Sequence, residues 1–116
     1  MMQWAKEVLP QHQAIIIELQ GELDTEGVKI LESTFLKLCK EDEFHLILNC
    51  AQLTYINSQG LGLLVSGKKS VGESGHKLVV TNLQEPIRRL FEVIRFDKIF
   101  PICESVDMAL LALKES

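Results

Sequence analysis

The stretch that decides the fold runs from His45 to Leu64 and has the sequence HLILNCAQLTYINSQGLGLL. It opens with a short apolar run over residues 45–48, which is typical of a strand covered on at least one face. Apolar residues at helical spacing follow and predict a helix over about residues 59–72. A strand that leads directly into a helix indicates an α/β architecture.

The same alternation of short strands and helices extends on both sides of this stretch. Further strands are predicted at residues 3–9, 14–19, 77–80 and 99–102, and further helices at about 25–41, 86–94 and 106–113. The first strand ends at Pro10 and pairs with the second as a hairpin, while Pro101 places the last strand at an edge or marks a strand end. The order ββαβαβαβα predicts an α/β fold with about four helices and a mixed sheet of four to five strands. Its later strands are expected to be parallel, because each follows a helical crossover.

Length and composition limit the classes of function. The chain has 116 residues, which predicts a single domain over residues 1–116. With 47% apolar and 24% charged residues it is not a disordered chain. Its formal charge of −4 argues against a nucleic-acid partner, which would bind a basic stripe. No segment has the pattern of a signal peptide or a membrane span, so we expect a cytoplasmic protein with no membrane partner.

Cysteine and histidine positions do not indicate a metal or cofactor site. The cysteines lie in or beside apolar segments, which favours buried, reduced thiols: Cys39, Cys50 and Cys103. The histidines share no metal-ligand spacing with each other or with the cysteines: His12, His45 and His76. We expect neither a metal nor a cofactor.

Residues 54–64 join the predicted strand to its helix, and they place Ser58 at a helix N-terminus beside the carboxyl end of a strand. Ligands of α/β sheets bind at such ends, where free backbone N–H groups favour negative charge. The simplest structural interpretation is that Asn57 or Ser58 caps the helix. A cap and a regulatory site are compatible.

Three enzyme motifs are incomplete in this region. A dinucleotide fingerprint requires a third glycine where Val65 stands, and a phosphate-binding P-loop requires Ser or Thr where Lys69 stands. A nucleophile elbow around Ser58 has Ile56 in place of its first glycine. Nothing in the sequence places His76 beside Ser58 as a general base. We therefore expect no catalytic residue and no enzyme activity.

Three segments together resemble the STAS domain family, and more narrowly the bacterial anti-sigma factor antagonists: Gly21–Asp24, Leu53–Gly62 and Phe96–Phe100. The resemblance extends from about Gln3 to Leu113. It implies a STAS-like fold and a role in transcription regulation through protein–protein interaction.

The resemblance also implies a site. By position, Ser58 corresponds to the serine that is phosphorylated in the family by an anti-sigma factor that is itself a serine kinase of the GHKL type. Asn57 and Gln59 stand where the family usually has Asp and Ser or Thr. Gly60 matches the family glycine, and Asp24 matches the acid of its Gly-x-Leu-Asp loop. The expected partner-binding residues are Asp24, Asn57, Ser58, Gln59 and Gly60.

Two hypotheses of function follow from this resemblance. In the first, the unphosphorylated protein binds the anti-sigma factor and frees the sigma factor, phosphorylation of Ser58 ends binding, and a serine phosphatase is a second partner. In the alternative, the protein is a constitutive STAS scaffold subunit of a stressosome-like or transporter-associated assembly, and Ser58 is only a helix cap. An exposed Trp4 would additionally indicate a weak homodimer formed through the first strand.

Charge is distributed unevenly around Ser58. Residues 1–58 carry a net charge of −5 and residues 59–116 a net charge of +1. A phosphate at Ser58 would therefore add negative charge to a face that is already acidic.

Overall fold

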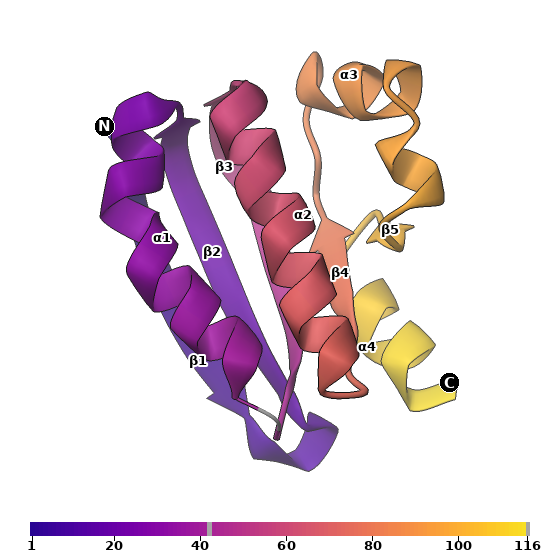
Figure 1. The fold of residues 1–116 in the computed structure, drawn as a ribbon. Helices are drawn as coiled ribbons and strands as arrows, with labels where there is room; N and C mark the ends of the chain where they lie inside the picture. Colours follow the sequence, from indigo (N-terminus) through magenta and orange to yellow (C-terminus); the bar gives the residue numbers. More distant parts are fainter. Residues whose placement is uncertain (42, 116) are drawn as a thin grey trace.

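The computed structural model describes residues 1–41 and 43–115. Its centre is a five-stranded sheet with the strand order β1-β2-β3-β4-β5 (Figure 1). The strands are β1 (Gln3–Leu9), β2 (Ala14–Leu23), β3 (His45–Ile56), β4 (Leu78–Thr81) and β5 (Ile102–Cys103). β1 pairs antiparallel with β2, whereas every later neighbouring pair is parallel. The predicted mixed sheet with an N-terminal hairpin is confirmed.

Helices cover both faces of this sheet. They are α1 (Thr25–Lys40), α2 (Ser58–Glu73), α3 (Ile87–Val93) and α4 (Val106–Glu115), with the short 3-10 turns η1 (Pro10–His12) and η2 (Phe96–Lys98). α1 and α2 lie side by side on one face, while α4 packs on the other (Figure 1).

Successive residues of the central strands enter two hydrophobic clusters on opposite faces of the sheet. Leu46 and Leu48 belong to the larger cluster, which holds buried residues of α1, α2 and α3. Ile47, between them, belongs to the smaller cluster with Ala109 of α4. Because both faces of β3 are covered here, its first residues form a continuous apolar run rather than an alternating one.

Two strands are longer than predicted. The sequence predicts that β2 ends near residue 19 and β3 near residue 48, but both continue, with Gly21 paired to Leu53 and Leu23 paired to Ile56. The segment around Gly21 is therefore a strand and not a loop. In this part of β3, buried Leu53 and Ile56 are separated by exposed polar or aromatic positions, so hydropathy alone does not reveal the strand.

The last strand is displaced from its predicted position. Ile99 closes η2, and the backbone N–H of Phe100 donates to the carbonyl of Phe96 at 2.8 Å. Phe100 is buried with its ring centroid 5.5 Å from that of Phe96. Only residues 102–103 pair with β4, because Pro101 has no N–H to donate to a ladder. The predicted edge position of this strand is confirmed.

Burial of the cysteines and of Trp4 refines the sequence-based expectations. Cys39 and Cys50 are buried, and burial raises the pKa of each thiol to about 12, so both stay protonated at neutral pH. Cys103 is only partly buried. Trp4 packs partly buried against the larger cluster, so the exposed side chain that would have indicated self-association through β1 is not present.

A glycine sets the distance between α1 and α2. A Cβ atom added at Gly67 would lie 2.5 Å from Cε2 of Phe35 and 3.1 Å from Sγ of Cys39. Phe35 is fully buried, so its ring has no free space into which to move. Gly62 precedes Gly67 on α2, and a Cβ atom added there would have no other atom within 4 Å.

These two glycines give a matched test of the packing between α1 and α2. We expect Gly67→Ala to lower the free energy of unfolding by about 1–3 kcal/mol, because the added methyl group overpacks the core. Gly62→Ala should raise it by up to about 1 kcal/mol, because alanine is the better helix former. Urea denaturation of both variants measures the difference. Equal effects of the two substitutions would contradict the close approach at Gly67.

Candidate functional site

Two helices begin together at one end of the sheet. β2 and β3 end in register at Leu23 and Ile56, and each strand is followed by one capping residue and then a helix. The Asp24 carboxylate accepts a hydrogen bond from the backbone N–H of Gly27 at 2.8 Å. The Asn57 side chain accepts one from the backbone N–H of Gly60 at 3.0 Å. The two caps hold α1 and α2 with their N-termini at the same end (Figure 1).

Hydrogen bonds between the two strand–helix junctions hold them together. The backbone N–H of Asn57 donates to the carbonyl of Leu23 at 3.2 Å, which extends the strand pairing to the first residue beyond β3. The Asn57 side-chain amide donates to the hydroxyl of Thr25 at 3.5 Å. Asn57 therefore caps its own helix and also contacts the first residue of the neighbouring one.

Gly60 allows α2 to begin close to β2. A Cβ atom at this position would lie 2.5 Å from the carbonyl oxygen of Leu23 and 2.8 Å from Cγ1 of Ile56. The first contact is with backbone, which cannot move aside as a flexible side chain can. Glycine is thus required here by the close approach of a neighbouring strand, not by an unusual backbone conformation.

Ser58 is the first residue of α2 and its side chain is exposed. Since Asn57 makes the capping hydrogen bond, the Ser58 hydroxyl has no hydrogen-bond partner among residues 1–41 and 43–115. The sequence left Asn57 and Ser58 as alternative caps, and the structure selects Asn57. The role of helix cap that the scaffold hypothesis gave to Ser58 is wrong. The hydroxyl remains accessible beside the free N–H groups of the first turn.

The other predicted site residues differ in exposure. Gln59 is exposed beside Ser58, Asp24 and Asn57 are partly buried with their side chains engaged in capping, and Gly60 is buried. The surface formed by Asp24, Asn57, Ser58 and Gln59, above the buried Gly60, is called the Ser58 surface below.

Charged and aromatic residues lie close in sequence to the residues of the Ser58 surface. Glu22 and Glu26, each two residues from Asp24 in the chain, are exposed, and Glu22 pairs with the N-terminal ammonium group of Met1 at 3.3 Å. Tyr55 is 50% exposed although it lies in β3. The sequence analysis did not assign Tyr55 a role; its position between polar Thr54 and buried Ile56 is the signal that a strand side chain faces outward there.

His45 and His76 lie far from Ser58 in the fold. His76 lies two residues before β4, at the amino end of the parallel strands, and its ring is 4.8 Å from that of His45, the first residue of β3. Both histidines are therefore at the opposite end of the sheet from Ser58. Within the described ranges, no three His, Cys, Asp or Glu side chains are arranged to hold a metal ion. None of the helices described here combines the length and hydropathy needed to cross a bilayer.

Comparison with known families agrees with this geometry. The family model of the STAS domain matches residues 3–109. The chain belongs to the STAS domain family. A STAS relative, the anti-sigma-B factor antagonist of Staphylococcus epidermidis, is 27% identical over 92 residues, which is 79% of this chain and 85% of the relative.

Solved structures with the same fold include regulators of this family. An anti-sigma factor antagonist from Mycobacterium paratuberculosis superposes with a TM-score of 0.87 at 20% identity, covering 98% of this chain and 95% of that one. The Bacillus cell fate determinant SpoIIAA in its phosphorylated form has a TM-score of 0.73 at 17% identity, covering 96% of this chain and 99% of that one. At these identities the likeness establishes the STAS fold.

Substitutions at the two adjacent positions separate the cap from the free hydroxyl. We expect Asn57→Ala to lower the free energy of unfolding by about 1 kcal/mol, because a first-turn N–H loses its acceptor. Asn57→Asp retains an acceptor and should preserve stability. Ser58→Ala should change the value by less than about 0.5 kcal/mol, as for other exposed positions. If denaturation showed Ser58→Ala to be as costly as Asn57→Ala, the assignment of the cap would be wrong.

Proposed function

We propose that this protein is an anti-sigma factor antagonist regulated by phosphorylation of Ser58. In its unphosphorylated form it binds, through the Ser58 surface, an anti-sigma factor that is also a serine kinase of the GHKL type, and so releases the sigma factor. Phosphorylation ends that binding, and a serine phosphatase restores it. The observation that carries the proposal is the accessible, uncommitted hydroxyl of Ser58 at the start of α2.

The position of Ser58 suits a phosphate without a change of fold. Phosphoserine carries a charge of about −1.5 to −2 at neutral pH. At the first turn of α2 this charge lies near backbone N–H groups and the positive end of the helix dipole. Because Asn57 makes the cap, a phosphate on Ser58 does not displace the capping hydrogen bond of α2. The effect of phosphorylation is therefore expected on the surface rather than in the core.

The charges around Ser58 support loss of binding as that effect. Asp24 and Glu26 already make the neighbouring start of α1 acidic, whereas the carboxylate of Glu22 is paired with the N-terminal ammonium group. A phosphate adds to this charge and must be desolvated when a partner covers it, which is costly unless the partner supplies cations. A loss of about 3 kcal/mol weakens binding roughly a hundredfold.

A groove between the two helices extends the proposed interface. It has a volume of about 470 Å³, begins beside Gln59, and is lined on α1 by Val28 and Lys29 and on α2 by Gly62 and Ser66. Both walls begin at the Ser58 surface, so a partner that contacts Ser58 has a hollow next to it into which side chains fit. Gly60 would act beneath this interface as a spacer and not as a contact.

The relatives support the same class of function. The Staphylococcus epidermidis relative is named as an antagonist of an anti-sigma-B factor, and a protein of the same fold is described in a phosphorylated form. For this chain we propose both a GHKL-type kinase as the partner and Ser58 as the residue that it phosphorylates.

The proposal is tested with each GHKL-type serine kinase encoded in the same genome. We expect one of them to transfer phosphate from ATP to the wild type and not to Ser58→Ala. Binding to that kinase should be retained by Ser58→Ala and weakened about a hundredfold by phosphorylation, with Ser58→Asp intermediate. Ser33→Asp, which adds the same charge at an exposed position of α1, is the matched control and should bind like the wild type.

Binding measured by calorimetry and phosphate transfer measured by mass spectrometry decide the outcome. If none of the kinases phosphorylates Ser58, or if phosphorylated and unmodified protein bind equally, the switch is refuted. Equal binding by all forms would instead support the constitutive scaffold hypothesis.

A further inference from the structure

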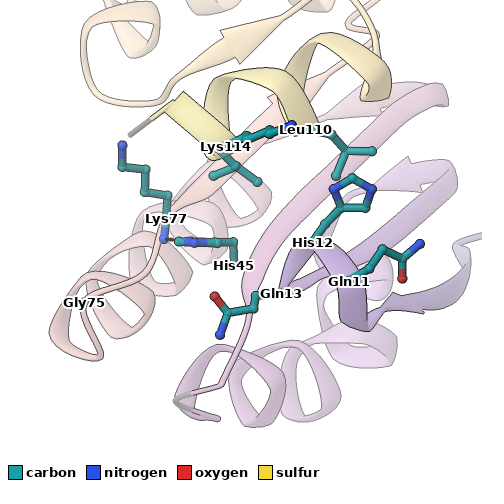
Figure 2. Close-up of a pocket in the computed structure, with 9 residues that line it drawn as sticks. Gln11, His12, Gln13, His45, Gly75, Lys77, Leu110 and Lys114 are labelled. Carbon is teal, nitrogen blue, oxygen red and sulfur yellow. Dashed lines mark hydrogen bonds between the residues drawn. The ribbon is translucent and has the colours of Figure 1, made fainter.

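A hollow lies at the end of the sheet opposite the Ser58 surface. It has a volume of about 550 Å³, within the range of small-molecule sites. η1, the amino ends of β3 and β4, and α4 form its walls. Figure 2 shows the side chains of His12, His45 and Lys77 around this hollow, below Leu110 and Lys114 of α4. We call it the distal pocket.

The polar side chains of the distal pocket favour negative charge. Lys77 precedes β4 and Lys114 lies in the last turn of α4, so the two ammonium groups come from separate elements. Among the described residues that line the pocket, none carries a carboxylate, although the whole chain has a formal charge of −4. Neither lysine forms an ion pair within the described part of the chain. With respect to residues 1–41 and 43–115, both cations are therefore available to a ligand.

His45 adds a hydrogen-bond donor. Its Nδ1 accepts a hydrogen bond from the backbone N–H of Lys77 at 3.0 Å, so the neutral ring carries its proton on Nε2. Burial, the ring of His76 and the charge of Lys77 all lower the pKa of His45. The charge of Lys77, which disfavours a proton on the ring, also attracts an anion to the pocket.

The pocket also has an apolar wall and a fixed floor. Leu110 and Leu113 line it from α4. The carbonyl of Gln13, a residue with a left-handed backbone, accepts the N–H of His45 at 2.7 Å and holds the η1 turn against the start of β3. A ligand that combines a charged group with a short apolar body matches these walls.

We propose that the distal pocket binds a small organic anion, with its phosphate or carboxylate group between Lys77 and Lys114 and its apolar part against Leu110 and Leu113. The site is independent of the proposed function, because it lies at the other end of the sheet. A ligand bound there stabilises the folded domain and does not compete with a partner at the Ser58 surface.

The full-length protein is titrated with phenyl phosphate, with inorganic phosphate and with benzylamine at constant ionic strength, and the backbone amides are followed by NMR. For phenyl phosphate we expect saturable shifts, with a Kd on the order of 1 mM, confined to residues 11–13, 45, 75–77 and 110–114. Inorganic phosphate should bind at least about fivefold more weakly, since it has no apolar part, and benzylamine should not shift these amides.

Two double variants with the same change of net charge distinguish binding in the distal pocket from a general effect of net charge. Lys77→Gln with Lys114→Gln should weaken the binding of phenyl phosphate about tenfold or more, because two charge-assisted contacts are lost. Lys69→Gln with Lys98→Gln alters exposed lysines outside the pocket and should leave the Kd within about twofold. All four lysines are exposed, so both variants are expected to fold.

Three results would overturn the proposal. The first is shifts that do not saturate or that scatter over the surface, which is the behaviour of nonspecific screening. The second is equal weakening by the two double variants. The third is binding of benzylamine at the same amides with affinity equal to that of phenyl phosphate.

Discussion

The in-register ending of β2 and β3 is the constraint on which the rest of the structure depends. The hydrogen bond from the N–H of Asn57 to the carbonyl of Leu23 extends the pairing past the last residue of β3. Gly60 has no Cβ atom, and a Cβ atom there would collide with the carbonyl oxygen of Leu23 in β2. Both helices therefore start at the same level. A surface made of two capped helix N-termini, with Ser58 exposed on one of them, follows from that single alignment.

This arrangement separates the structural task from the proposed regulatory one. Asn57 satisfies the first turn of α2, and Gly60 and Gly67 set the distances to β2 and α1, so the fold does not depend on the hydroxyl of Ser58. A residue that contributes little to stability can gain and lose a charged group without unfolding the domain. The distal pocket lies at the far end of the same parallel strands, which makes it a separate site and not an extension of this surface.

The sequence was sufficient for the order of elements, the hairpin, the parallel strands and the helix boundaries, because apolar periodicity and helix caps are local signals. It was insufficient for the ends of β2 and β3, where exposed positions such as Thr54 and Tyr55 hide a strand that only pairing reveals. The position of Ser58 at the start of a helix was predictable from the strand and helix patterns on either side of it. The choice between Asn57 and Ser58 as cap depends on side-chain geometry, and the hollow around His45 depends on α4, which is distant in sequence.

The central claim is that the exposed Ser58 hydroxyl is the site of regulation. Its most direct test is mass-spectrometric mapping of phosphate on the protein isolated from its native cells, during growth and after stress. The account predicts phosphate on Ser58 in one condition and its loss in the other. Phosphate confined to a different residue, or a Ser58 that is unmodified in every condition, would contradict it.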